Sequence, residues 1–171
     1  MNRIKVVNEA ADLVSIFRAV DTDVKKEVLK EVSLDWRTAR EIKEKFGDEG
    51  KSALNLFDKM KLVETRWQQP PGVGNATASG PEKAYHTYYS SFQITASCPI
   101  YEICDVLAVA VMPEPKFKKL EETVFKAVGA EGKFAGDIAE ELKVSQTMMK
   151  SLVKRSSKLE YRGHRIERFK E

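Results

Sequence analysis

The sequence has few residues that could form disulfides or bind a metal. Its 171 residues include two cysteines and two histidines. Two thiols cannot form the disulfide network that stabilises small secreted domains. If Cys98 and Cys104 lie in one regular helix, about 9 Å of rise separates them and they occupy different faces. We therefore expect buried structural thiols in a reducing compartment. A redox or metal switch at a dimer interface is the alternative.

Membrane-spanning segments and enzyme motifs are also missing from the sequence. The most apolar stretch, residues 100–112, is too short to cross a bilayer, and the first residues lack the pattern of a secretory signal. Gly72 and Gly74 are not followed by the third glycine of a dinucleotide-binding turn. His86 and His164 have no clustered cysteine or carboxylate. We expect a cytoplasmic protein that has no membrane contact, no enzyme activity, no cofactor and no metal.

The positive charge is concentrated at the C-terminal end. The net charge is +3, yet residues 143–171 hold nine basic and three acidic residues, or +6, so the rest carries −3. A basic element on a nearly neutral chain is typical of contact with a phosphate backbone. A solvated basic surface is the alternative interpretation.

Residues 137–155 have the pattern of a helix-turn-helix. Ile138 and Leu142 share one face of a first helix, Ser145 is a suitable N-cap for the second, and Met148 and Leu152 are its expected inner face. Strands at 159–162 and 165–169 would follow as a short wing, which predicts a winged helix. We expect backbone contacts to DNA from the outward side of this unit, namely Gln146, Thr147, Lys150, Lys154, Arg162 and Arg165. The alternative is a small helical domain that never touches DNA.

The N-terminal half has the same pattern in a more complete form. The spacing of Val6, Ala10, Leu13, Phe17 and Val20 predicts an amphipathic helix, and a second helix follows Thr22. Thr38 and Glu41 form a capping-box pattern for a helix at 39–46 that Gly47 ends. Another helix is expected at 49–61. Strands at 62–68 and 84–94 then flank a long loop at 70–82, which together form a wing.

The apolar run at 100–112 predicts a helix that is buried on more than one side. A second subunit is its natural cover, and burial between the two halves of one chain is the alternative. Pro113 and Pro115 separate this helix from the next. The expected division is a winged helix-turn-helix at 1–97, a connecting and dimerisation helix at 98–114, and a second winged helix-turn-helix at 115–171. The predicted fold class is mainly α with small β-wings (α+β).

The order of these elements, with the segments TAREIKEKFG, DKMKLVETRW and YHTYYSSFQ, resembles the archaeal ArsR-type winged-helix transcription regulators over residues 8–112. The resemblance implies a homodimer that binds double-stranded operator DNA, with its recognition helix in the major groove and its wing along the backbone. By position, the recognition surface corresponds to Lys51, Ser52, Asn55 and Lys59, and the wing to Arg66, Lys83 and His86.

One difference from the family concerns metal sensing. Metal-sensing members carry a Cys-x-Cys pair in the helix before the recognition helix, and residues 38–46 contain no cysteine. Metal sensing at that place is therefore not expected, and the resemblance indicates no particular effector, operator or direction of regulation. A winged-helix protein-interaction module in a transcription-related assembly is the alternative function.

Overall fold

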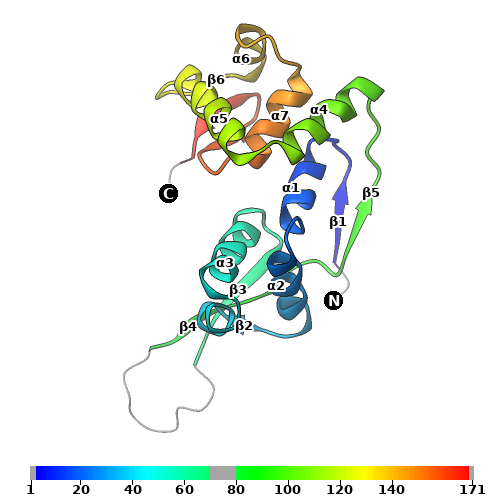
Figure 1. Ribbon diagram of the computed structural model, residues 1–171. Helices are drawn as coiled ribbons and strands as arrows, with labels where there is room; N and C mark the ends of the chain where they lie inside the picture. Colours follow the sequence, from blue (N-terminus) through cyan, green and yellow to red (C-terminus); the bar gives the residue numbers. More distant parts are fainter. Residues whose placement is uncertain (1–2, 70–79, 170–171) are drawn as a thin grey trace. The chain divides into compact units, whose positions relative to one another are not determined.

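The computed structural model describes residues 3–69 and 80–169, which group into two compact units (Figure 1). Unit 1 comprises Met1–Val6 and Ala19–Gln93, and unit 2 comprises Val7–Arg18 and Ile94–Glu171. Helices predominate and the strands form only small sheets, so the predicted α+β class is confirmed. Most of the loop expected at 70–82, namely residues 70–79, lies outside the described residues.

Unit 1 is built around helices and a three-stranded sheet. Its elements are α2 (Asp23–Leu34), β2 (Arg37–Thr38), α3 (Ala39–Lys59), β3 (Val63–Gln68) and β4 (Glu82–Thr87). The sheet is antiparallel in the order β2-β4-β3, and its register places Val63 opposite Thr87 and Gln68 opposite Glu82. Val28, Ile42 and Phe57 are fully buried between the helices and the sheet.

Helix α3 consists of two segments because Gly47 interrupts it. Gly47 has φ 67° and ψ −157°, a conformation that glycine adopts without steric cost. At the start of α3, the Thr38 hydroxyl accepts from the Glu41 amide at 3.1 Å, and the Glu41 carboxylate accepts from the Thr38 amide at 2.7 Å. The predicted capping box and the predicted break at Gly47 are both confirmed.

Unit 2 repeats this order of elements after two additional helices. Its elements are α1 (Asp12–Ala19, of which Ala19 belongs to unit 1), α4 (Ile100–Val111), α5 (Glu114–Val128), β6 (Lys133–Phe134), α6 (Ala135–Glu141), α7 (Gln146–Arg155), β7 (Leu159–Arg162) and β8 (Arg165–Arg168). The strand order β6-β8-β7 corresponds to β2-β4-β3 of unit 1. Gly163, at φ 61°, forms the tight turn of the hairpin, as the sequence predicted.

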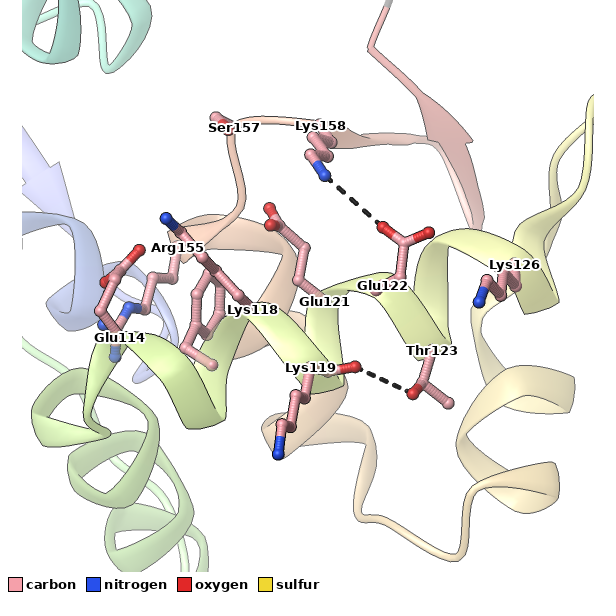
Figure 2. Close-up of a pocket in the computed structure, with 11 residues that line it drawn as sticks. Glu114, Lys118, Lys119, Glu121, Glu122, Thr123, Lys126, Arg155, Ser157 and Lys158 are labelled. Carbon is pink, nitrogen blue, oxygen red and sulfur yellow. Dashed lines mark hydrogen bonds and ion pairs between the residues drawn. The ribbon is translucent and has the colours of Figure 1, made fainter.

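Arg155 joins α7 to the connection between α4 and α5. Its side chain is only 3% exposed, and its guanidinium donates to the carbonyl oxygens of Val109 and Met112, each at 2.7 Å. It also pairs with the carboxylate of Glu114 at 2.8 Å (Figure 2). These bonds satisfy carbonyl groups that the end of a helix leaves without a partner. Arg155 therefore caps the C-terminal end of α4.

The first predicted helix is wrong at its N-terminal end. Ile4–Val7 is the strand β1, which pairs with β5 (Ser91–Ile94), and α1 begins only at Asp12. The predicted strand at 84–94 is accordingly split into β4 and β5, which belong to different sheets. The helical spacing from Val6 to Val20 was misleading because a run of β-branched residues with a distant pairing partner favours a strand.

The division of the chain also differs from the boundaries expected at 97/98 and 114/115. Residues 7–18 group with the C-terminal part, and the apolar helix α4 belongs to unit 2. Ala10 and Val14 lie in the same apolar cluster as Val106 and Phe117. The separate domains at 1–97, 98–114 and 115–171 remain a prediction about independent folding.

Two glycines test how the backbone of unit 2 is packed. Gly129 and Gly132 have φ values of 67° and 76°, but a Cβ on Gly132 would lie 2.9 Å from the carbonyl oxygen of Ile166, whereas one on Gly129 meets nothing within 4 Å. Gly129→Ala should lower the free energy of unfolding by about 1–3 kcal/mol, because φ 67° with ψ −163° is a backbone conformation that almost only glycine adopts. Gly132→Ala should cost about 1–3 kcal/mol more because of the clash. Urea denaturation of both variants measures the difference, and equal losses would contradict the close packing at Gly132.

Candidate nucleic-acid interface

The second segment of α3 has one buried and one exposed face. Ala53, Leu54 and Phe57 are buried in unit 1. The predicted recognition residues are all exposed and, at their spacing, share one side of the helix: Lys51, Ser52, Asn55 and Lys59. The structure thus brings these four residues together on one polar surface, which we call the α3 face.

Lys83 connects the sheet to α3. Its ammonium group pairs with the Asp58 carboxylate at 2.8 Å and lies 5.2 Å from the centre of the Tyr85 ring. The hydrogen bond to Asp58 raises the pKa of Lys83 above its ordinary value. Trp67 is the residue opposite Lys83 in the β3–β4 ladder, and it is exposed. Lys83 therefore sets the position of the ribbon beside the α3 face.

The other two predicted wing residues lie on the opposite side of the ribbon. In β4, His86 is three positions from Lys83, and alternation along a strand puts them on opposite faces. The Arg66 guanidinium lies 4.1 Å from the centre of the Trp36 ring, which stacks on His86 with a centroid distance of 5.4 Å. A carboxylate oxygen of Glu64 lies 4.0 Å from Nδ1 of His86. Arg66 and His86 thus belong to one stack that is centred on Trp36.

The corresponding helix of unit 2, α7, has its polar side covered by α1 and α4. Lys154 pairs with Asp12 at 2.6 Å and Lys150 with Glu9 at 3.5 Å. The hydroxyl of Thr147 donates to Glu102 at 2.6 Å. Lys154 is exposed, as predicted, whereas Thr147 and Lys150 are only partly exposed, because acidic residues remote in sequence hold them. Gln146 is exposed.

The start of α7 is held in the same way. Ser145 caps the helix by accepting from the Met148 amide at 2.9 Å, as predicted, and its hydroxyl also donates to Asp105 of α4. Met149 is fully buried, whereas the predicted inward residue Met148 is only partly buried. The additional cover from α4 explains the difference, because it buries a second side of α7.

The two predicted wing arginines of unit 2 have partners within the unit. Arg162 pairs with Glu160 at 3.0 Å and with Glu167 at 3.5 Å. Arg165 donates to the carbonyl oxygen of Gly132 at 2.8 Å. Both guanidinium groups thus stabilise the hairpin.

A hollow of about 850 Å³ lies along α5 and is lined mostly by charged residues of both signs (Figure 2). Lys158 pairs with Glu122 at 3.5 Å, and Glu121 is buried and accepts from the Ser156 hydroxyl at 2.5 Å. Three glutamates and five basic residues line the hollow, a formal excess of two positive charges, and two of the bases, Arg155 and Lys158, are paired with Glu114 and Glu122.

The two cysteines lie in different surroundings. Cys98 is half-buried against the core of unit 2, and Cys104 is exposed on α4. Within residues 3–69 and 80–169, no group of three or more His, Cys, Asp and Glu side chains is arranged to hold a metal ion. No helix in these ranges is both long and apolar enough to span a membrane.

A family model of the ArsR transcriptional regulator matches residues 7–170. The chain belongs to the ArsR transcriptional regulator family. This confirms the family resemblance seen in the sequence and extends it beyond residues 8–112, through unit 2. The family consists of transcription regulators, and this chain is one of them. A search of curated proteins found no match.

Tyr161 provides a test of the contacts around α7. Burial, with a smaller contribution from Glu9, raises the pKa of Tyr161 to about 12 from its ordinary 10.0. The folded state then retains a proton that the unfolded chain loses, so this contribution to stability is complete below pH 10 and is lost as the pH rises toward 12. Tyr161→Phe should make the unfolding free energy less dependent on pH in this window. Tyr101→Phe, at an exposed tyrosine of unit 2, is the control and should leave the dependence unchanged.

Proposed function

We propose that this ArsR-family chain is a homodimeric, sequence-specific DNA-binding regulator. In this proposal both units are winged helix-turn-helix units, and the α3 face of unit 1 enters the major groove. The ribbon of β3 and β4 follows the adjacent backbone. The observation that carries the proposal is the α3 face itself. It is an exposed polar surface on a helix whose other side is buried in the core of unit 1.

The residues of the α3 face suit the two kinds of contact that DNA recognition needs. Asn55 has an amide that can both donate to and accept from an adenine edge, and Ser52 can bond to a base or a phosphate. Lys51 and Lys59 supply positive charge for the backbone. The ion pair of Lys83 with Asp58 supports this arrangement, because it holds the ribbon at a set distance from α3.

The contacts of α7 favour unit 1 as the part that reads DNA. Lys150 and Lys154 would have to give up Glu9 and Asp12 before they could bind a phosphate. Ion pairs at partly exposed side chains contribute little, about 0–1 kcal/mol each, but two acidic residues beside a phosphate would also repel it. We therefore propose that unit 2 serves mainly in assembly.

Lysine substitutions on the two helices separate these roles. Lys51→Ala with Lys59→Ala should weaken binding to every duplex and lower the slope of log K against log salt by about two, one for each phosphate contact. Asn55→Ala should cost about 1–3 kcal/mol at one base position and relax the preference there. Lys150→Ala with Lys154→Ala removes the same charge from α7 and should leave both quantities unchanged. Fluorescence anisotropy at several salt concentrations gives all three results.

The selection of DNA sites from a random pool provides the duplexes for this experiment. An equal loss of affinity in the α3 and α7 lysine variants would assign backbone contact to both helices. If only the α7 variant loses affinity, unit 2 is the DNA-binding part and the proposed role of the α3 face is wrong.

Helix α4 supports the proposed dimer. Val106, Val109 and Ala110 are buried in unit 2. The opposite side of the helix is exposed and apolar, with Ile100 at 83% and Val111 at 77% exposure. Its members recur at helical spacing: Ile100, Cys104, Leu107, Ala108 and Val111. Such a stripe is unfavourable in water and suits a two-fold contact with the same stripe of a second copy.

Dimerisation predicts twice the 19.4 kDa chain mass in sedimentation at micromolar concentration. Leu107→Glu places a charge in the middle of the α4 stripe and should shift the protein to monomer. Leu34→Glu is the matched control, because Leu34 is 72% exposed on α2 and lies outside the stripe. A folded wild-type monomer would exclude the dimer, and an unchanged dimer in Leu107→Glu would place the interface elsewhere.

A further inference from the structure

Besides the hollow along α5, another hollow lies in unit 1, and no residue of the α3 face lines it. It measures about 360 Å³ and is formed by α2, by Leu62 after α3, and by residues 87–92 at the end of β4 and the start of β5. This volume is within the range of small-molecule sites. Its walls include five large apolar side chains: Val20, Leu29, Leu62, Tyr89 and Phe92.

The charged residues of this hollow have one sign. Lys26 and Lys30 lie one helical turn apart on α2, and among the described residues that line the hollow none is acidic. Lys26 pairs with Asp23 at 3.1 Å and Lys30 with Glu27 at 3.8 Å, and all four side chains are more than half exposed. Exposed pairs of this kind contribute about 0–1 kcal/mol, so an incoming carboxylate can displace them.

Hydroxyl groups supply further polar contacts beside the lysines. Ser33, Ser90 and Ser91 line the hollow together with Thr87. The hydroxyl of Ser33 donates to the Lys30 carbonyl at 2.7 Å, which leaves its oxygen able to accept another bond. The hollow thus combines an apolar wall with a cationic and hydroxylated rim, the chemistry of a site for an amphipathic anion.

We infer that this hollow is an effector site for an organic anion, a carboxylate with a one- or two-ring aromatic body. The carboxylate lies between Lys26 and Lys30, and the rings lie against Leu29 and Phe92. A neutral apolar ligand would leave the two ammonium groups unused, and a cation would be repelled by them. An aromatic body of this size also fits a space of about 360 Å³.

The position of the hollow connects it to the proposed DNA-binding surface. The amide of Leu62 donates to the Phe57 carbonyl of α3 at 2.9 Å, and the carbonyl of Leu62 accepts from the Tyr88 amide at 2.9 Å. A ligand against Leu62 and Tyr89 would therefore contact the residues whose hydrogen bonds connect α3 to the end of β4. This regulatory part of the inference rests on the proposed function, whereas ligand binding itself does not.

Calorimetric titration of the full chain without DNA tests the site. Naphthalene-1-acetate is the probe, and naphthalene-1-acetamide is its uncharged isostere. The acid should bind saturably, with one probe per chain, and roughly tenfold or more tightly than the amide, which corresponds to 1.4 kcal/mol. In Lys26→Gln with Lys30→Gln this preference should disappear. Ser91→Asp should weaken binding of the acid more than binding of the amide, because the aspartate adds a negative charge that repels the carboxylate of the probe.

Lys116→Gln with Lys119→Gln is the matched control, since it removes the same charge from exposed positions of α5. It should bind the acid like the wild type. No saturable binding, equal affinity for acid and amide, or an equal loss in the control would each overturn the site. Circular dichroism of the variants verifies that they fold.

A second titration in the presence of DNA tests the regulatory part alone. Saturating naphthalene-1-acetate should change the DNA affinity of the wild type and not that of the Lys26→Gln, Lys30→Gln variant. Ligand binding with unchanged DNA affinity would overturn the coupling and leave the site intact. A protein that binds the probe but no DNA would contradict the proposed function and not the ligand site.

Discussion

Unit 2 depends on the packing of α7 into one apolar core with α1, α4 and α5, and carboxylates around this core contact the polar side chains of α7. Glu9, just before α1, pairs with Lys150, and Asp12, the first residue of α1, pairs with Lys154. Glu102 and Asp105 of α4 accept hydrogen bonds from the hydroxyls at the start of α7. Arg155 then ties the far end of α7 to the end of α4. Most polar side chains of α7 are thereby held by other parts of unit 2, although Gln146 and Lys154 are exposed. The four residues of the α3 face are all exposed.

The two units show that one order of elements can have two surfaces with different chemistry. Both have a helix, a short strand, a helical pair and an antiparallel ribbon, with corresponding strand orders. Unit 1 leaves the outer side of its last helix to solvent, whereas unit 2 uses the equivalent side for internal contacts. The additional segments of unit 2, namely α4 and the region of Glu9 and α1, provide these contacts. The exposed apolar side of α4 is the surface proposed for the dimer.

The sequence predicted most of the helices because their signals are local. The capping box at Thr38 and Glu41, the break at Gly47 and the cap at Ser145 act within one turn and are present as expected. The four residues that the family resemblance placed on the α3 face are all exposed, and their helical spacing puts them on one side. The strand β1 was missed because its partner, β5, is more than eighty residues away, and helical spacing around Val6 was coincidental.

By itself, the sequence determined the fold class, the repeated order of elements, the family and the composition of the α3 face. Short-range periodicity, caps and turns specify these, since each depends on residues within a few positions. Only the tertiary structure decided which polar faces remain available. Ion pairs such as Lys154 with Asp12 and Lys83 with Asp58 join residues far apart in the chain. The spacing of polar residues along a helix predicts a polar side, but it does not predict which distant residues will cover that side.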